Sequence, residues 1–205
     1  MYPFYVPYIG TKLAPNDKFS ISTLHLKLGI VNKIISEIES RSDKCLPFCK
    51  SIGMVKDPYN GQDYSGRYYN ILLKNLDKLE EVVGETLSPL VKTLKCFEKI
   101  VHGCFGKEAS ENYQTLIDEF ENAWLENYRE FDMNLTNKVH VLISHVPQVI
   151  QRTGKGLFYQ SEEVVEAAHA KFDKFWQRYK VIDVESDKHG ENLLECVIDF
   201  VTKNI

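Results

Sequence analysis

The sequence lacks any uninterrupted apolar run of the roughly 18 residues that a membrane-spanning helix needs. Its first residues, Met1 to Pro7, also lack the basic start and leucine-rich stretch of a secretory signal peptide. We therefore expect a protein of the cell interior, in the nucleus or the cytoplasm, that has no membrane partner.

An excess of basic charge is also absent. The chain carries 25 Lys and Arg against 29 Asp and Glu, a net charge of −4. This balance gives no overall electrostatic footprint for nucleic acid, although a local basic face is still open. The five cysteines are odd in number and irregularly spaced, at positions 45, 49, 96, 104 and 196, which favours reduced thiols over a disulfide framework.

Catalytic signatures are missing as well. The sequence has no serine or cysteine elbow, no dinucleotide-binding fingerprint and no zinc-protease motif. Gly154-Lys155-Gly156 lacks the further glycine and the hydroxyl of a phosphate-binding loop, so it is interpreted as a turn. We therefore expect a chain that is not a self-sufficient enzyme and has no small-molecule substrate.

What the sequence does contain is helical periodicity, with apolar residues at three- and four-residue steps. The pattern predicts an all-α fold, a single domain over residues 1–205 with about seven helices and an extended N-terminal arm at 1–19. Ser20 or Ser22 is a suitable N-cap for the first helix, and Thr136 for the fifth. The helices are expected at about 21–41, 66–80, 89–103, 110–125, 136–146, 161–179 and 189–203.

Residues 42–65 are rich in proline, glycine and asparagine and are predicted to contain no helix. Cys45 and Cys49 lie in this segment and supply two of the four ligands of a tetrahedral zinc site. No second pair is spaced to complete it. The nearest additional candidates are Cys96, His102 and Cys104, and the alternative is two unrelated thiols in a loop.

Two further groups could bind a metal. His140 and His145 are five residues apart, so on an α-helix their rings diverge, and we interpret them as structural histidines of the core or an interface. Glu162, Glu166, His169 and Asp173 follow steps of four, three and four and share one side of a helix. Such carboxylates can hold a divalent cation, but one helix cannot surround it, and a solvated acidic face is the alternative.

Several segments resemble the C-terminal region of cut-and-paste DNA transposases of the CACTA type and related elements. They are Leu24 to Asn32, Leu72 to Leu79, and Lys138 to His145, the last followed by Gly154, Tyr159, Ser161, Glu162, Glu166 and His169. In these enzymes a ribonuclease H-like core holds two Mg²⁺ ions with two aspartates and one late glutamate, which a helical insertion separates from the second aspartate.

The resemblance implies that residues 20–135 correspond to the helical insertion and residues 136–205 to the transposase tail. Glu166 would then be the late glutamate, with Glu162 as a competing assignment and His169 as a possible neighbouring metal ligand. The two aspartates have no counterpart, and Thr23 stands where related elements often place one. One carboxylate cannot organise two-metal catalysis, so the fragment would be inactive alone and would need Mg²⁺ only if an upstream catalytic domain completed it.

Three functional classes therefore remain open. The first is a transposon-derived fragment that contacts DNA or its own kind. The second is a helical protein–protein interaction module with no nucleic-acid role. The third is a regulatory domain that binds metal through Cys45 and Cys49.

Overall fold

The computed structural model describes residues 21–56, 63–160, 172, 176–177 and 187–204. The chain divides into two compact units, residues 1–160 and 161–205, and each is described by itself. The all-α prediction is confirmed, because every regular element in the described parts is a helix and extended pairing there is limited to one isolated bridge. The expected N-terminal arm, residues 1–19, lies outside the described residues.

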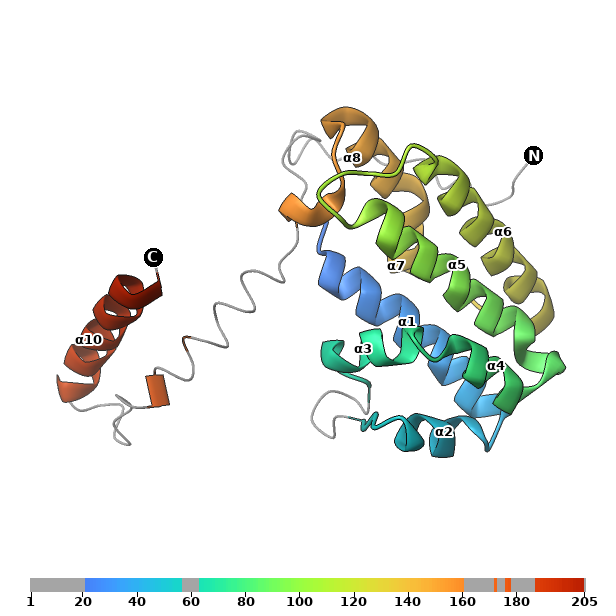
Figure 1. Ribbon diagram of the computed structural model, residues 1–205, viewed down its shortest axis with the longest axis horizontal. Helices are drawn as coiled ribbons and strands as arrows, with labels where there is room; N and C mark the ends of the chain where they lie inside the picture. Colours follow the sequence, from blue (N-terminus) through green and yellow to red (C-terminus); the bar gives the residue numbers. More distant parts are fainter. Residues whose placement is uncertain (1–20, 57–62, 161–171, 173–175, 178–186, 205) are drawn as a thin grey trace. The chain divides into compact units, whose positions relative to one another are not determined.

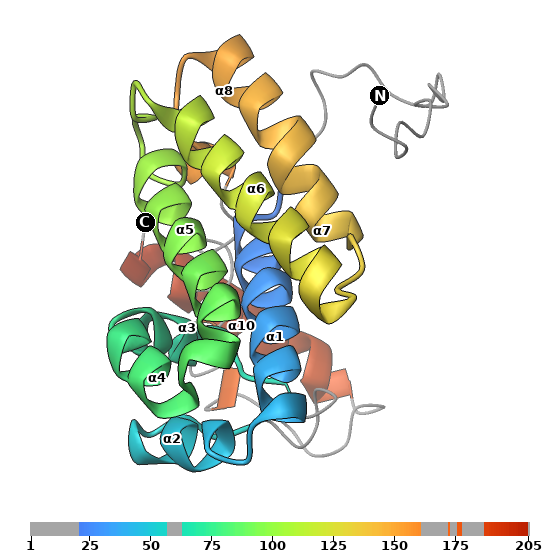
Figure 2. The same cartoon turned by 90° about the vertical axis from the view of Figure 1, so that its right-hand side faces the viewer.

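Helix α1, Thr23–Arg41, is the central helix of the first unit. It begins after Ser22, whose hydroxyl oxygen accepts a hydrogen bond from the His25 amide at 3.3 Å, so the expected N-cap is confirmed. Its apolar residues recur on one face, and Ile30, Ile34 and Ile38 are fully buried. This face contacts α2, α3, α5 and α7, so α1 carries much of the core (Figures 1 and 2).

Helices α5, Ser88–Cys104, and α6, Tyr113–Phe131, lie side by side and form the most extensive helix pair of this unit (Figures 1 and 2). Between them Phe97, Phe120 and Trp124 form an aromatic core. The Phe97 and Phe120 rings are 5.8 Å apart between centroids, as are the Phe120 and Trp124 rings. None of the three side chains is more than 1% exposed.

Helix α2, Cys45–Ser51, corrects the prediction that residues 42–65 contain no helix. Pro47 does not prevent this helix because it is the third residue. An amide in the first turn has no partner within the helix, so nothing is lost when proline stands there. A reverse turn then follows at Gly53, where φ is +82°.

The helix expected at 66–80 is two helices, α3 at Gly66–Leu73 and α4 at Leu76–Val83. The break lies at Asn75, whose side-chain amide donates a hydrogen bond to the Ile71 carbonyl at 2.8 Å. Asparagine competes in this way for the carbonyls that would continue the helical ladder. The chain therefore turns, and α4 starts in a new direction.

Helix formation after Thr136 is confirmed, and the Thr136 hydroxyl accepts from the Val139 amide at 3.3 Å. Three segments follow without a gap: α7 at Asn137–His140, a π-helical turn at Val141–His145, and α8 at Val146–Thr153. Their inward side chains belong to the core around α1 and α6, and the fully buried ones are Val139, Leu142 and Val146.

The segment Gly154 to Gly156 is a turn, as expected from the sequence. Gly154 ends α8 with φ +64°, a left-handed conformation that glycine adopts without strain. Gly156 passes so close to the carbonyl oxygen of Gly106 that a Cβ atom there would overlap it. A short 3-10 helix, Leu157–Gln160, closes the first unit.

In the second unit the structure describes α10, Asp187–Asn204, which confirms the last expected helix within two residues at each end. Most of the helix expected at 161–179 lies outside the described residues. No described helix combines the length and the apolar character needed to cross a membrane.

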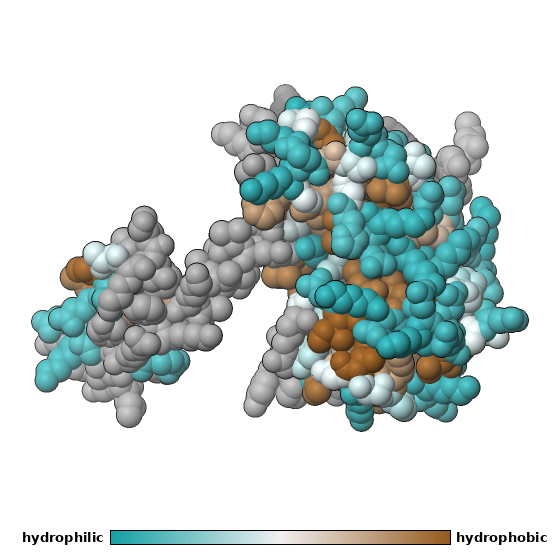
Figure 3. All heavy atoms as spheres, in the orientation of Figure 1, coloured by the Kyte–Doolittle hydropathy of each residue, from teal (hydrophilic) through white to brown (hydrophobic). Residues whose placement is uncertain are grey.

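The surface of the first unit is mainly hydrophilic on the face that Figure 3 shows, with an apolar area in the region of α3. Its exposed large apolar side chains come from separate segments, among them Leu46, Val55, Tyr128, Leu135 and Phe158. Scattered apolar residues of this kind are normal for a folded domain.

Candidate metal centre

Cys45 and Cys49 lie on the same face of α2, because residues four apart on an α-helix are neighbours. Both side chains are fully buried, and neither forms a disulfide. Neither is therefore a loop thiol, in contrast to the alternative that the sequence left open.

Glu39 joins the two thiols from the last turn of α1. One carboxylate oxygen of Glu39 and the sulfur atoms of Cys45 and Cys49 all lie within 4.8 Å of one another. The connection from α1 to α2 is only three residues long, so α2 folds back beside the end of α1. We call this group the thiol–carboxylate cluster. Within residues 21–56, 63–160, 172, 176–177 and 187–204, no other group of three histidine, cysteine or acidic ligands is this compact.

Two side chains hold the carboxylate in place. The Tyr64 hydroxyl donates to Glu39 Oε1 at 2.7 Å, and Lys56 Nζ lies 2.5 Å from Glu39 Oε2. The two partners are neighbours because Lys56 and Tyr64 form the isolated antiparallel bridge, and the ammonium group lies 5.5 Å from the centre of the Tyr64 ring. Both oxygens of Glu39 are thus bound by the protein.

Asn32 fixes Tyr64 against α1. Its side-chain nitrogen donates to the Tyr64 carbonyl at 3.0 Å, and its side-chain oxygen accepts from the Tyr64 amide at 3.1 Å. This two-point contact satisfies both backbone groups of a residue that is 5% exposed. Tyr64, Lys56 and Glu39 are therefore positioned from the middle of α1 rather than by α2.

The two thiols differ in acidity. The hydrogen bond that the Cys45 thiol donates is the largest influence on Cys49 and lowers its pKa, against the opposing effect of burial and with support from Tyr64. The same hydrogen bond, followed by burial, raises the pKa of Cys45. Burial and then the bond to Glu39 raise the pKa of Tyr64. Cys49 is therefore the first of the three to become an anion.

His140 and His145 come together in a way that their spacing did not predict. Their ring centroids are 5.3 Å apart and the rings are nearly perpendicular, at 87°. The reason is the π-helical turn Val141–His145, which has more residues per turn than an α-helix and so brings residues five apart onto one side. His140 is exposed and His145 half-buried, so neither ring belongs to the core.

Hydrogen-bond contacts of the two histidines are local. Nδ1 of His140 lies 3.4 Å from the Ser144 hydroxyl, and Nδ1 of His145 lies 3.2 Å from the side-chain oxygen of Gln148. The pair gains no third metal ligand from the described residues. Of the two structural roles expected from the sequence, the role in the core is wrong because neither ring is buried, and a role at an interface stays a prediction.

The remaining candidates do not join the thiol–carboxylate cluster. Cys96, His102 and Cys104 lie on α5 and are absent from it. Glu162, Glu166, His169 and Asp173 lie outside the described residues.

Sequence reasoning identified Cys45 and Cys49 but missed Glu39, Lys56 and Tyr64. One signal for Glu39 was present. A carboxylate near the C-terminal end of a helix faces the negative end of the helix dipole, so it needs a cationic or hydrogen-bonding partner. Lys56 and Tyr64 are those partners here.

Comparison with known proteins returned no match: no family model, no curated protein and no solved structure is similar to this chain. The resemblance to transposase tails therefore stays a prediction from the sequence.

Proposed function

We propose that the first unit is a zinc-binding helical module in which one ion, held by the thiol–carboxylate cluster, joins α1 to α2. The observation that carries this proposal is the approach of three ligand atoms from two helices to within 4.8 Å of one another. Two of the three ligands are thiols. Zn²⁺ binds thiolate and carboxylate ligands together, whereas Mg²⁺ requires oxygen ligands.

Lys56 acts as the counter-cation of Glu39 when no metal is bound. Its side chain is 33% exposed, so the ammonium group can turn into water when an ion takes its place beside the carboxylate. Zinc then replaces the protons of the thiols as well as the lysine contact. Cys49, whose pKa is lowered, loses its proton first.

A structural role for the ion fits the surroundings better than a catalytic one. A catalytic zinc keeps an open position for water and substrate. Here Cys45 and Cys49 are fully buried and Tyr64 is 5% exposed. The fourth position therefore belongs to the Tyr64 oxygen or to one trapped water.

The function that follows is a helical interaction module whose α1–α2 end depends on its ion. Zinc would connect the end of α1 to the whole of α2 and, through the Tyr64 hydroxyl that donates to Glu39, to the segment around Tyr64. Such an ion contributes its binding free energy directly to folding.

The test is a titration of the reduced, metal-free full chain with Zn²⁺ in competition with a chromophoric chelator. We expect one zinc per chain. Replacing Zn²⁺ by Co²⁺ should give the visible bands of tetrahedral cobalt and a thiolate-to-cobalt charge-transfer band. This spectrum reports sulfur ligands in the wild-type chain, so it does not depend on the folding of a variant. A chain that binds neither ion would overturn the proposal.

Variants then identify the ligands. Cys45→Ser, Cys49→Ser and Glu39→Gln should each weaken zinc binding at least tenfold, because each removes one ligand. Cys96→Ser and Cys196→Ser remove thiols elsewhere in the chain and should leave affinity and the cobalt spectrum unchanged. Tyr64→Phe tests the fourth position: an unchanged cobalt spectrum assigns it to water, whereas a changed one reports the loss of a Tyr64 contact, either with the ion or with Glu39.

A further inference from the structure

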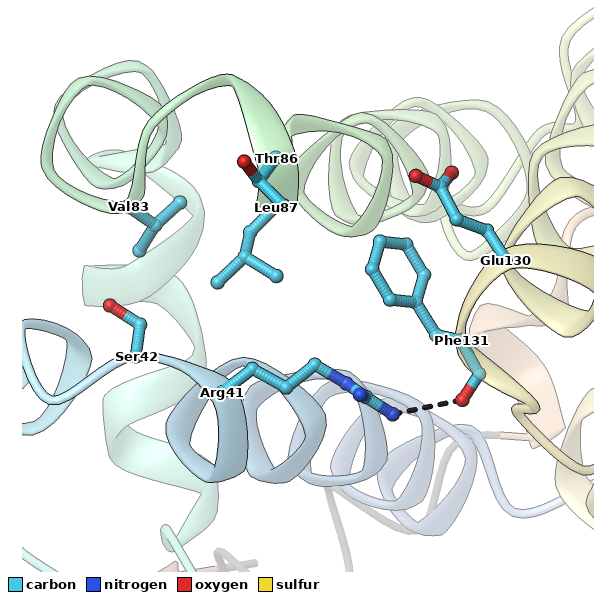
Figure 4. A pocket seen from close by; sticks show the side chains of 7 residues that line it. All are labelled: Arg41, Ser42, Val83, Thr86, Leu87, Glu130 and Phe131. Carbon is cyan, nitrogen blue, oxygen red and sulfur yellow. Dashed lines mark hydrogen bonds between the residues drawn. The ribbon is translucent and has the colours of Figure 1, made fainter.

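A second site lies at the meeting point of three helix ends in the first unit. It is an open pocket of about 600 Å³, within the usual size range of ligand sites. Its walls come from the end of α1, from α4 with the short 3-10 helix Glu85–Leu87, and from the end of α6. The lining residues, shown in Figure 4, are Arg41, Ser42, Val83, Thr86, Leu87, Glu130 and Phe131.

The field of the backbone favours a cation in this pocket. Helices α1, α4 and α6 end at Arg41, Val83 and Phe131, and each of these residues lines the pocket. The C-terminal end of a helix carries a partial negative charge. Helix α5 begins nearby at Ser88 with the opposite polarity, but Glu80 stands next to that end and accepts a hydrogen bond from the Ser88 hydroxyl.

Arg41 shows how one wall of the pocket accommodates a cationic group. Its guanidinium donates to the Phe131 carbonyl oxygen at 2.9 Å, and the guanidinium carbon lies 5.3 Å from the centre of the Phe131 ring. The same group donates to Glu37 at 3.3 Å, a carboxylate that Lys33 also contacts at 2.6 Å. The guanidinium of Arg41 is thus already held by a carbonyl oxygen, a carboxylate and an aromatic ring, which leaves it less available to an anionic ligand.

Glu130 supplies a negative charge that no ion pair within the described residues balances. Its side chain is exposed, and it forms no hydrogen bond or ion pair with the described residues. Figure 4 shows Glu130 and Phe131 projecting from α6 toward the side on which Thr86 and Leu87 lie. The pocket is also lined by the apolar side chains of Val83, Leu87 and Phe131, of which Leu87 and Phe131 are buried, and Val83 lies on the opposite wall from Glu130 (Figure 4).

We propose that this pocket binds an arginine or lysine side chain of a partner peptide. The cationic group pairs with Glu130 at the negative helix ends, and its aliphatic stem lies on Val83, Leu87 and Phe131. A carboxylate, an apolar surface and three helix C-terminal ends complement a long side chain that is apolar along its stem and positive at its tip. The site uses none of the ligands of the thiol–carboxylate cluster.

The experiment is an NMR titration of the ¹⁵N-labelled full chain with short peptides to millimolar concentration. The probe is an acetylated and amidated peptide with one arginine between alanines, and lysine replaces the arginine in a second peptide. We expect saturable shifts of the amide signals of residues 83–87 and 130–132. The same peptide with citrulline, which is neutral and has nearly the shape of arginine, should bind about tenfold more weakly because it cannot form the ion pair.

Glu130→Gln should weaken binding of the arginine peptide by about the same factor. The matched control is Glu126→Gln, one turn earlier on α6. Glu126 is also exposed, but it pairs with Lys92 at 3.3 Å and does not line the pocket. Equal binding of the arginine and citrulline peptides, no saturable shift with either cationic peptide, or equal losses in the two variants would overturn the proposal. Binding of an aspartate peptide that Arg41→Gln abolishes would assign the pocket to an anion instead.

Discussion

Two buried regions of the first unit depend on opposite kinds of chemistry. Between α5 and α6, Phe97, Phe120 and Trp124 bury apolar surface, which is favourable without any further partner. Between α1 and α2, Cys45, Cys49 and the partly buried Glu39 have polar atoms that burial destabilises unless each finds a partner. Burial alone therefore says little about a region. The aromatic core depends on volume, and the thiol–carboxylate cluster depends on charge, protons and ions.

Phe97→Ala tests the aromatic core and should have the largest effect. The side chain is fully buried and contacts the rings of Phe105 and Phe120, so its removal leaves a cavity. We expect a loss of about 3–5 kcal/mol in the free energy of unfolding, measured by urea denaturation. Leu135→Ala, at a side chain that is 47% exposed, should change this free energy by no more than about 0.5 kcal/mol. Similar losses in the two variants would show that the α5–α6 pair does not carry the core.

Zinc should raise the free energy of unfolding by an amount that depends on the thiol–carboxylate cluster and not on the aromatic core. At a free Zn²⁺ concentration about one hundred times Kd, the free energy of unfolding should rise by about 2.7 kcal/mol over its value in chelator. Phe97→Ala should retain this increment, because its side chain is absent from the cluster. Glu39→Gln should lose at least about half of it, because a tenfold weaker affinity leaves no more than about 1.4 kcal/mol at the same free Zn²⁺ concentration. An increment that survives in Glu39→Gln but vanishes in Phe97→Ala would reverse the assignment of the two regions.

Asn32→Ala tests how the cluster is held by α1. The change removes two hydrogen bonds to the Tyr64 backbone and leaves that amide and carbonyl without their partner. We expect a loss of about 1–3 kcal/mol in urea denaturation together with weaker zinc binding. Asn70→Ala, at an exposed position of α3, is the control and should change neither quantity appreciably. Unchanged zinc affinity in Asn32→Ala would show that Tyr64 does not position the carboxylate.

Local signals account for the part of the fold that the sequence predicted well. The apolar period of α1, the N-caps Ser22 and Thr136 and the extent of α10 depend on neighbours within a few residues. The errors occurred where a single local interaction decided between two structures. Asn75 hydrogen-bonds to the Ile71 carbonyl at the break between α3 and α4, and Pro47 is harmless only because α2 begins two residues before it.

The candidate site was predictable only in part, for a related reason. The i, i+4 spacing of Cys45 and Cys49 is visible in the sequence, but Tyr64 reaches Glu39 across 25 residues, and Asn32 reaches Tyr64 across 32. No periodicity reports such contacts. The approach of His140 and His145 depends on a π-helical turn, which α-helical spacing rules do not anticipate.

The ion pair between Glu80 and Lys95, at the surface, should have the smallest effect on the free energy of unfolding. Lys95, followed by the Ser88 hydroxyl, lowers the pKa of Glu80 below its ordinary value of 4.5. A carboxyl group with a lowered folded-state pKa stabilises the fold above its unfolded pKa, and this contribution is lost as the pH falls through the folded-state pKa. The Glu80 side chain is 34% exposed, so water and salt screen the pair, and we expect it to contribute roughly 0.5 kcal/mol or less to the free energy of unfolding.

The measurement compares urea unfolding of the wild type and Glu80→Gln between pH 7 and pH 3. The wild type should be slightly more stable at pH 7 and lose this advantage as the pH falls below 4.5 and through the lowered folded-state pKa of Glu80. Added salt should reduce the difference at pH 7. A difference as large as that of Phe97→Ala would mean that charge near the surface, and not buried volume, dominates the stability of this unit.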